Sequence, residues 1–184
     1  GQHQMWSAQH YIYDYPDSFI TSGGLGTMGF GLPAAMGVKV GCPDKTVWLV
    51  DGDGSLQMTI QELGTIAQDN IDIKIAVMNN GYLGMVRQWQ DLFYQKNYVA
   101  TPLTCPDFVK IAEAYCIAGV TVTRREEVVP AIKQAMAHDG PFLVNFMIEP
   151  EENVYPIVPP GAANIEFIDM PKKEVSAWQR KSTP

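Results

Sequence analysis

The sequence predicts an α/β fold: a doubly wound, mainly parallel sheet with helices on both faces, followed by an extended C-terminal tail. Several apolar runs are continuous rather than alternating, which is typical of strands covered on both faces. Segments with helical periodicity lie between these runs, and such alternation favours a parallel sheet. The chain has 184 residues, of which 46% are hydrophobic and 18% charged. This length and composition suit one α/β domain with a core of its own.

Strands are expected where apolar residues are densest, and helices between them. The expected strands are residues 18–22, 46–50, 73–78, 119–123 and 142–148. The expected helices are residues 32–40, 55–68, 107–115 and 126–137. Pro33 suits the first turn of its helix, and Ser55 is expected to be the N-cap of the next. After residue 150 the pattern breaks, so we expect a domain over residues 1–150 and a proline-rich tail over residues 151–184.

Charge and cysteine content argue against several classes of function. The formal net charge is −7, so no nucleic-acid partner is expected, because polyanion binders carry a basic face. A small anion held by backbone amides or by a metal remains compatible with this charge. Cys42, Cys105 and Cys116 are widely spaced without a CxxC motif, which predicts free thiols in a reducing, cytoplasmic compartment and no zinc site. No apolar run reaches membrane-spanning length, so no membrane partner is expected.

Polar residues follow two of the expected strands where each strand ends. In "VWLVDGDGSLQ", Asp53 stands between Gly52 and Gly54 just past one strand, and Asn80 follows the next. Ligands of doubly wound sheets bind outside the carboxyl ends of the strands, so Asp53 and Asn80 are expected at one edge. The glycines let a ligand come close, and a helix beginning near Ser55 points free N–H groups there. Because Mg²⁺ combines such oxygen ligands with phosphate, this edge is predicted to hold a metal-bridged diphosphate.

Each half of this pattern also has a simpler interpretation. DGDG and NNG are both common turn sequences, but their pairing across one strand–helix–strand unit is more specific. The pairing resembles the motif of thiamine diphosphate enzymes, GDG followed by NN. This resemblance implies that Asp53, Asn80 and the main-chain carbonyl of Tyr82 hold Mg²⁺, which in turn holds the diphosphate. Asp51 and Asn79 match no ligand position of the motif and are expected to be structural.

Longer stretches resemble one family of these enzymes. "GQHQMW", "TSGGLGTMGFGLPAAMG", "NNGYLGMVRQWQDLFY" and "YPIVPPGAANIEFI" are similar to the large catalytic subunit of acetolactate synthase, over essentially the whole chain but only the last third or so of such a subunit. The resemblance implies that the backbone of Gly26 accepts a hydrogen bond from the cofactor's 4′-amino group and that Met28 is the apolar wedge that bends the cofactor. Gln2 and His3 match positions near the diphosphate. By themselves, the glycines would indicate a flexible loop and Met28 a core residue.

A helix expected after the metal corner carries three candidate substrate residues. Met85 and Trp89 are four positions apart and so share one face, and Val86 lies beside them. From the spacing alone, an amphipathic core stripe is the simpler interpretation. The resemblance implies instead that this face lines the substrate channel and that Trp89 favours 2-oxobutyrate as the second substrate. It also implies that sulfonylurea-type herbicides contact the same surface.

The activity implied by the resemblance is decarboxylation of pyruvate and condensation of the hydroxyethyl unit with pyruvate or 2-oxobutyrate, in the biosynthesis of isoleucine and valine. The family also uses FAD, bound by a domain outside this sequence, and takes its activating glutamate from a neighbouring subunit. This chain alone is therefore not expected to turn over. In full-length form a homodimer or tetramer with a separate regulatory subunit is expected. Two alternatives stay open: another thiamine diphosphate enzyme, such as pyruvate oxidase, glyoxylate carboligase or a decarboxylase, and a non-catalytic diphosphate-binding module.

The tail has two interpretations. Residues 151–168 match an arm that closes over the cofactor in the family, which predicts a lid. The segment is rich in proline, which suits neither a helix interior nor a central strand, yet it keeps many apolar side chains. A strap packed permanently on its own domain is an equal alternative, since prolines also suit rigid surface segments.

Overall fold

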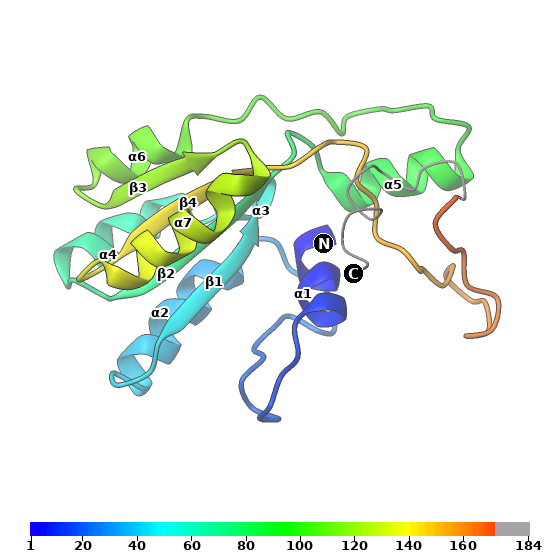
Figure 1. The fold of residues 1–184 in the computed structure, drawn as a ribbon. Coiled ribbons are helices and arrows are strands. Elements are labelled where there is room, and N and C mark those ends of the chain that lie inside the picture. The colour runs from blue at the N-terminus through cyan, green and yellow to red at the C-terminus, as the bar shows by residue number, and fades with distance from the viewer. Residues whose placement is uncertain (172–184) are drawn as a thin grey trace. The chain divides into compact units, whose positions relative to one another are not determined.

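The structure, a computed structural model, describes residues 1–171, and the chain divides into two compact units, Gly1–Glu152 and Asn153–Pro184. The helices and strands of the described residues all lie in the first unit (Figure 1). In chain order they are α1 (Gln2–His10), α2 (Gly31–Gly41), β1 (Val47–Gly52), α3 (Asp53–Gln57), the 3₁₀ helix η1 (Ile60–Glu62), α4 (Leu63–Gln68), β2 (Ile73–Asn79), α5 (Gly84–Phe93), α6 (Phe108–Ala114), β3 (Ala118–Val122), α7 (Arg125–Ala137) and β4 (Phe142–Met147). No helix among residues 1–171 is long and apolar enough to cross a membrane.

The sheet confirms the predicted fold class. Its strands pair in the order β1-β2-β4-β3, and every pair is parallel. The chain moves in one direction from β1 through β2 to β3 and then returns to β4. Because parallel crossovers are almost always right-handed, this reversal places α7 on the opposite face of the sheet from α2, α4 and α6 (Figure 1). The result is a doubly wound sheet with helices on both faces.

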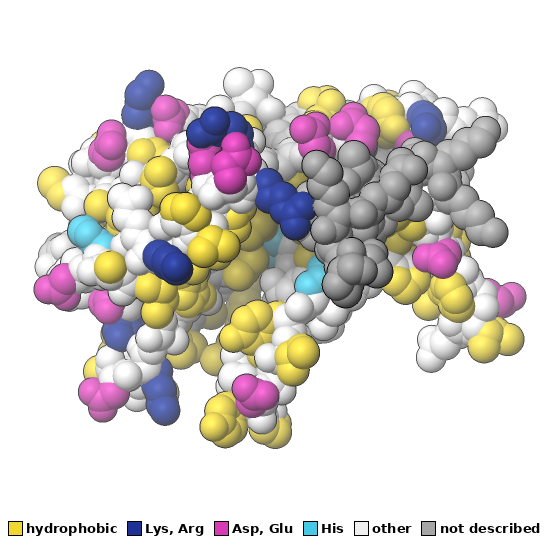
Figure 2. All heavy atoms as spheres, in the orientation of Figure 1, with side chains coloured by type: hydrophobic (Ala, Val, Ile, Leu, Met, Phe, Trp, Pro, Cys, Tyr) yellow, Lys and Arg dark blue, Asp and Glu magenta, His cyan; other side chains and the backbone are white. Residues whose placement is uncertain are grey.

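Two apolar clusters fill the two sides of the sheet. On one side, β2 contributes Ile73 and Ile75, which pack with Leu32 of α2 and Phe108 of α6, all fully buried. On the other side, a smaller cluster joins α7 to β3 and β4. Each side chain of this size contributes about 1.5–3 kcal/mol when fully buried. The second side is covered less completely, and Figure 2 shows apolar side chains at the surface over α7 and the neighbouring sheet.

The register brings the ends of β1 and β2 side by side. Gly52 pairs with Met78 in the parallel ladder. Asp53 follows directly after β1, and Asn80 follows directly after β2. The expectation that these two residues share one edge of the sheet is therefore confirmed, because the crossover through α3, η1 and α4 makes β1 and β2 neighbours.

Two predicted elements are wrong. Residues 18–22 form no strand: Ile20 is 52% exposed and the segment pairs with no strand of the described chain. Its apolar composition favoured a strand, but no neighbour supplies a ladder for it. The helix expected over residues 55–68 is divided into α3, η1 and α4. Thr59 leaves the helical conformation, with φ −134°, and its hydroxyl donates to the Gly29 carbonyl at 3.1 Å.

The starts of α6 and α7 follow the local chemistry, whereas the start expected at Ser55 does not. Asp107 caps α6 by accepting the N–H of Lys110 at 3.2 Å, and Glu127 accepts the N–H of Arg124 at 3.1 Å at the start of α7. Ser55 is not an N-cap, because α3 begins two residues earlier with Gly52 as its cap. The extended conformation of Gly52 and the helical turn that follows put Asp53 in the first turn instead.

The second unit contains no helix within its described residues. Ile157 and Ile168 form an antiparallel bridge, in which each backbone N–H donates to the other's carbonyl, at 3.0 and 2.7 Å. The peptide bond between Tyr155 and Pro156 is cis. Whether this unit is a lid or a strap stays a prediction.

Candidate functional site

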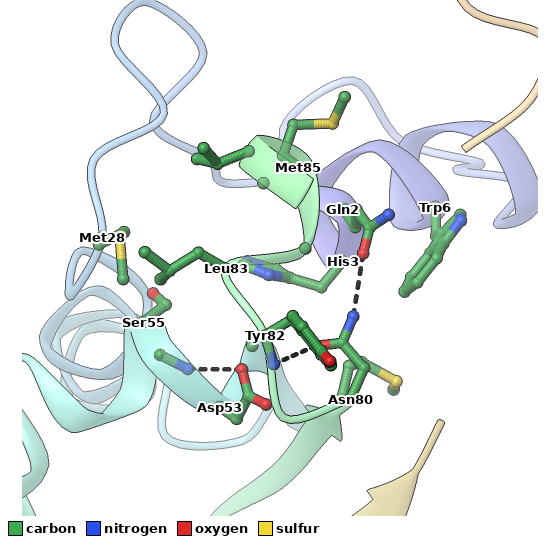
Figure 3. Close-up of a pocket in the computed structure, with 16 residues that line it drawn as sticks. Gln2, His3, Trp6, Met28, Asp53, Ser55, Asn80, Tyr82, Leu83 and Met85 are labelled. Carbon is green, nitrogen blue, oxygen red and sulfur yellow. Dashed lines mark hydrogen bonds between the residues drawn. The ribbon is translucent and has the colours of Figure 1, made fainter. Parts of the chain in front are cut away.

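The centre of the candidate site is the carboxylate of Asp53 at the beginning of α3 (Figure 3). Its Oδ1 accepts the N–H of Gly54 at 2.7 Å, and its Oδ2 accepts the N–H of Gly81 at 2.7 Å. The thiol of Cys105 lies 3.5 Å from Oδ2 and completes a third hydrogen bond. Two ionised carboxylate oxygens offer about four lone-pair positions, so these three donors leave room for a further electrophile such as a metal ion.

The charge of Asp53 is buried without an ion pair in the described chain, although the N-terminal ammonium of Gly1 lies near enough to interact with it electrostatically. The side chain is only 2% exposed, and it forms no ion pair within residues 1–171. Burial raises the pKa of the Asp53 carboxyl above its ordinary value, although the N–H groups of Gly54 and Gly81 oppose the shift. A buried carboxylate is stabilised by a cation at this position. The corner is therefore suited chemically to a positive ion.

Asn80 supplies the second oxygen of the corner. Its Oδ1 accepts the N–H of Tyr82 at 3.1 Å, and its Nδ2 donates to Gln2 Oε1 at 3.0 Å (Figure 3). An amide oxygen has two lone pairs, so Oδ1 can accept from Tyr82 and still bind a cation. In the described part of the chain, no group of three or more His, Cys, Asp or Glu side chains could hold a metal. A metal here would rely on one carboxylate with amide, carbonyl and ligand oxygens, a donor set that fits Mg²⁺.

A cavity lies against this corner and collects most of the residues singled out from the sequence. It is lined by Gly1, Gln2, His3, Trp6, Met28, Gly52, Asp53, Gly54, Ser55, Met78, Asn80, Tyr82, Leu83, Gly84, Met85 and Val86. Two of the predicted site residues are not among them. Gly26 lies in the preceding loop with φ +61°, and Trp89 lies further along α5 with 43% of its surface exposed.

Crowding explains why glycines flank Asp53. A Cβ at Gly54 would lie 3.0–3.2 Å from atoms of Leu103, Leu83 and Met28, and one at Gly52 would lie 2.9 Å from His3 Nδ1. Neither glycine has a positive φ, so close approach and not backbone conformation requires them. Any larger residue at either position would push against the side chains that surround the corner.

His3 and Asp51 form a second polar pair behind the cavity. His3 Nε2 lies 3.4 Å from Asp51 Oδ1. Burial lowers the pKa of His3 to about 3, and burial raises the pKa of Asp51 to about 6. At neutral pH the contact therefore joins a neutral imidazole to a carboxylate and is not an ion pair. The Asp51 carboxylate also accepts the N–H of Gly52 at 2.9 Å, which fixes the turn into α3.

The loop that carries Met28 is tied to the same corner. The hydroxyl of Ser55, which is buried, accepts the N–H of Gly29 at 3.0 Å. Gly29 has φ +86°, and a Cβ there would lie 2.9 Å from Met58 Cβ, so only glycine fits. These contacts hold Met28 against Gly54, with its Sδ-methyl facing the cavity wall (Figure 3).

The helix α5 is braced by an arginine that was not expected from the sequence. Arg87 is buried and lies between two rings, 5.0 Å from the centroid of Tyr82 and 4.8 Å from that of Tyr98. Its guanidinium also donates to the carbonyl of Pro150 at 2.7 Å. Cation–π contacts of this kind are strongest when they are removed from water. Arg87 therefore fixes the orientation of the helix that carries Met85, Val86 and Trp89.

Cys105 and Gln88 were also not expected at the site, because their contacts join distant parts of the chain. Burial raises the pKa of Cys105 to about 12, so its thiol keeps the proton that it donates to Asp53. Gln88 is fully buried on α5 and accepts the amide of Gln2 at 3.1 Å. No local spacing indicates either contact. Only the polarity of Gln88 on an otherwise inward-facing position could have suggested a buried partner.

Comparison with known proteins places this arrangement in context. Residues 1–146 match the family model described as thiamine pyrophosphate enzyme, C-terminal TPP binding domain. The chain is 51% identical over 170 residues to acetolactate synthase isozyme 2 large subunit of Escherichia coli K12, covering 92% of this chain and 31% of that protein. It is 51% identical over 173 residues to acetolactate synthase large subunit IlvB1 of Mycobacterium tuberculosis, covering 91% of this chain and 28% of that protein. The chain thus spans about three tenths of the length of these relatives.

A solved structure shares the fold. The thiamine diphosphate-dependent 4-hydroxybenzoylformate decarboxylase of Rhodococcus jostii RHA1 superposes with a TM-score of 0.62 at 34% sequence identity. The match covers 66% of this chain and 23% of that protein. The larger part of the decarboxylase therefore has no counterpart in this chain.

Proposed function

We propose that this chain supplies the diphosphate and metal half of an acetolactate synthase active site. The chain belongs to the thiamine pyrophosphate enzymes and carries their C-terminal TPP-binding domain. The complete enzyme would decarboxylate pyruvate and condense the hydroxyethyl unit with pyruvate or 2-oxobutyrate in the biosynthesis of isoleucine and valine. Similarity to acetolactate synthases over 92% of this chain supports this choice. The cofactors are thiamine diphosphate and Mg²⁺, with FAD bound elsewhere in the full-length enzyme.

The buried carboxylate of Asp53 is the observation that carries the proposal. It is buried at the carboxyl ends of β1 and β2 and forms no ion pair among the described residues. Asp53, Asn80 and the carbonyl of Tyr82 would hold Mg²⁺, and Mg²⁺ would bind the diphosphate oxygens. Gly52 and Gly54 would let the diphosphate come close to the backbone.

The remaining cavity residues define what this chain contributes to the reaction. When bound, the cofactor supplies an electron sink for decarboxylation of a 2-oxo acid. Met28, Leu83 and Met85 form an apolar wall of the same cavity, which would exclude water from the reacting carbon and favour loss of the carboxylate charge. Gln2 and His3 line the same cavity and would lie near the diphosphate, with the neutral imidazole of His3 adding no charge.

The deciding experiment is an assay of the full-length protein with pyruvate, with and without thiamine diphosphate and Mg²⁺. Acetolactate formation that requires both would support the proposal. The structural similarity to a decarboxylase favours a second candidate, a 2-oxo acid decarboxylase, which would release CO₂ and an aldehyde without acetolactate. Cofactor binding with no CO₂ release would indicate a non-catalytic diphosphate-binding module.

The assembly and the compartment of the enzyme are further parts of the proposal. Similarity to acetolactate synthase large subunits supports a homodimer or tetramer of the full-length form, to which a regulatory subunit would bind. The three cysteines are free, which agrees with a cytoplasmic compartment.

Trp89 is expected to set the choice of the second substrate. It lies on α5 one turn after Met85 and is 43% exposed, so its ring is available to a substrate in the assembled enzyme. Trp89→Leu should lower the ratio of acetohydroxybutyrate to acetolactate roughly 5- to 150-fold when pyruvate and 2-oxobutyrate compete, because one methylene in an apolar pocket contributes about 1–3 kcal/mol. Phe93→Leu, an equally exposed aromatic on the same helix, is the control. An unchanged ratio in Trp89→Leu would assign the residue to packing.

A further inference from the structure

Three buried amide side chains lie in series behind the metal corner. Gln88 on α5 is 0% exposed, Gln2 on α1 is 4% exposed and Asn80 after β2 is 9% exposed. Gln2 Nε2 donates to Gln88 Oε1 at 3.1 Å, and Asn80 Nδ2 donates to Gln2 Oε1 at 3.0 Å. Figure 3 shows the second of these bonds, with Gln2 reaching down from α1 to the end of β2. We call these three residues the amide chain.

Backbone groups at both ends fix the direction of the amide chain. The N–H of Tyr82 can only donate, so Asn80 must present Oδ1 to it, at 3.1 Å. Asn80 can then only donate to Gln2 through Nδ2, so Gln2 must accept this bond with Oε1. Gln2 Nε2 is thereby turned toward two acceptors, Gln88 Oε1 and the carbonyl of Glu152, the latter at 3.3 Å. A carbonyl can only accept, so the chain cannot reverse without losing bonds at both ends.

We propose that Gln88 and Gln2 are positioning residues, whose buried hydrogen bonds orient Asn80 so that its amide oxygen faces the Mg²⁺ of the cofactor. An amide nitrogen has no lone pair to give to a metal, whereas the oxygen keeps one beside the bond from Tyr82. A reversed Asn80 would place two N–H groups against the cation. The proposal rests on the proposed function, and it assigns to Gln88 a role that its position outside the cavity would not suggest.

Gly84 is the structural condition for this arrangement. A Cβ at Gly84 would collide with Gln2 Oε1 and lie 2.8 Å from Asn80 Nδ2. The first residue of α5 must therefore lack a side chain for the two amides to meet. The same helix carries Gln88 one turn later. The helix α5 therefore leaves space for Gln2 and Asn80 at its first residue and supplies the last residue of the amide chain.

The test is a Mg²⁺ titration of the full-length protein by calorimetry at saturating thiamine diphosphate. Gln88→Met keeps the length of the side chain but removes the acceptor for Gln2, and it should weaken Mg²⁺ binding about 10- to 100-fold, the usual range for residues that orient a metal ligand. Gln88→Glu keeps an acceptor oxygen whether ionised or protonated, and it should recover most of the affinity. The kcat of Gln88→Met should approach that of the wild type at saturating Mg²⁺.

Gln90→Met is the matched control, because Gln90 lies on the same helix and its amide donates to the carbonyl of Val99 at 3.0 Å, away from the corner. It should lower thermal stability without changing Mg²⁺ affinity. A Gln88→Met affinity within twofold of wild type, an equal loss in Gln90→Met, or no recovery in Gln88→Glu would each overturn the proposal. A wild-type protein that binds thiamine diphosphate without any need for Mg²⁺ would instead contradict the proposed function on which it rests.

Discussion

Asp53→Ala should abolish Mg²⁺-dependent binding of thiamine diphosphate to the full-length protein. Asp53 is the buried carboxylate of the corner, and among the described residues no other carboxylate lines the cavity. Its removal would leave the protein with only neutral oxygen donors for the Mg²⁺ that carries the diphosphate, which do not compensate for the loss of the ion's hydration. Calorimetry with thiamine diphosphate, with and without Mg²⁺, measures the effect directly.

Asp44→Ala is the control for Asp53→Ala, since Asp44 lies in an exposed turn away from the cavity and should bind the cofactor as the wild type does. Asp53→Asn should bind the cofactor with an affinity between those of the wild type and Asp53→Ala, because it keeps an oxygen in a similar position but removes the charge. Metal-dependent binding of unchanged affinity in Asp53→Ala would show that the corner is only a turn.

Lys74→Ala should lower the free energy of unfolding by about 2–3 kcal/mol, the cost of leaving buried polar groups without partners. Lys74 is 4% exposed on β2, and its ammonium donates to the carbonyls of His138 and Gly140 at 2.9 and 2.6 Å. His138 is the C-cap of α7, so the charge also lies at the negative end of that helix. Lys74 also pairs with the carboxylate of Asp72, whose side chain is 41% exposed. This ion pair contributes less to stability than the two buried hydrogen bonds because solvent screens it.

Urea denaturation followed by circular dichroism measures this loss. Lys110→Ala is the comparison, because the Lys110 side chain is 79% exposed and its pair with Asp107 lies at the surface; its effect should stay below about 0.5 kcal/mol. Equal midpoints for the two variants would mean that the carbonyls at the end of α7 find water when Lys74 is removed.

The sequence was informative where burial dictates composition. β2 and β4 are continuous apolar runs because they lie inside the sheet and are covered on both faces. β1 lies at the edge and alternates between buried and more exposed residues. The polar residues that follow β1 and β2 indicate a shared edge. The register of Gly52 against Met78 confirms that these two strands are neighbours. The same logic failed for residues 18–22, which have strand composition but no strand beside them. Composition reports the preference of a segment, whereas pairing depends on what the rest of the fold supplies.

Residues whose contacts cross the chain could not be predicted. The residues of α1 show no regular apolar spacing, so neither the helix nor the burial of Gln2 was expected. Cys105 was interpreted only as a free thiol, because its contact with Asp53 joins positions that no local pattern relates. The division of the helix over residues 55–68 depends on a bond from Thr59 to Gly29, which is equally invisible in the local sequence.

The amide chain and the metal corner differ in how far apart their parts lie along the polypeptide. Asp53 and Gly81 are separated by 28 positions, whereas Gln2 reaches Asn80, Gln88 and Glu152 across 78, 86 and 150 positions. Longer loops cost more entropy to close, and distant contacts form later in folding. The carboxylate corner should therefore assemble early from one strand–helix–strand unit, and α1 should dock last. In pulse-labelled hydrogen exchange during refolding, the Gly81 amide should gain protection before the amides of α1, so that the protein acquires a place for the metal before the orientation of Asn80 is fixed.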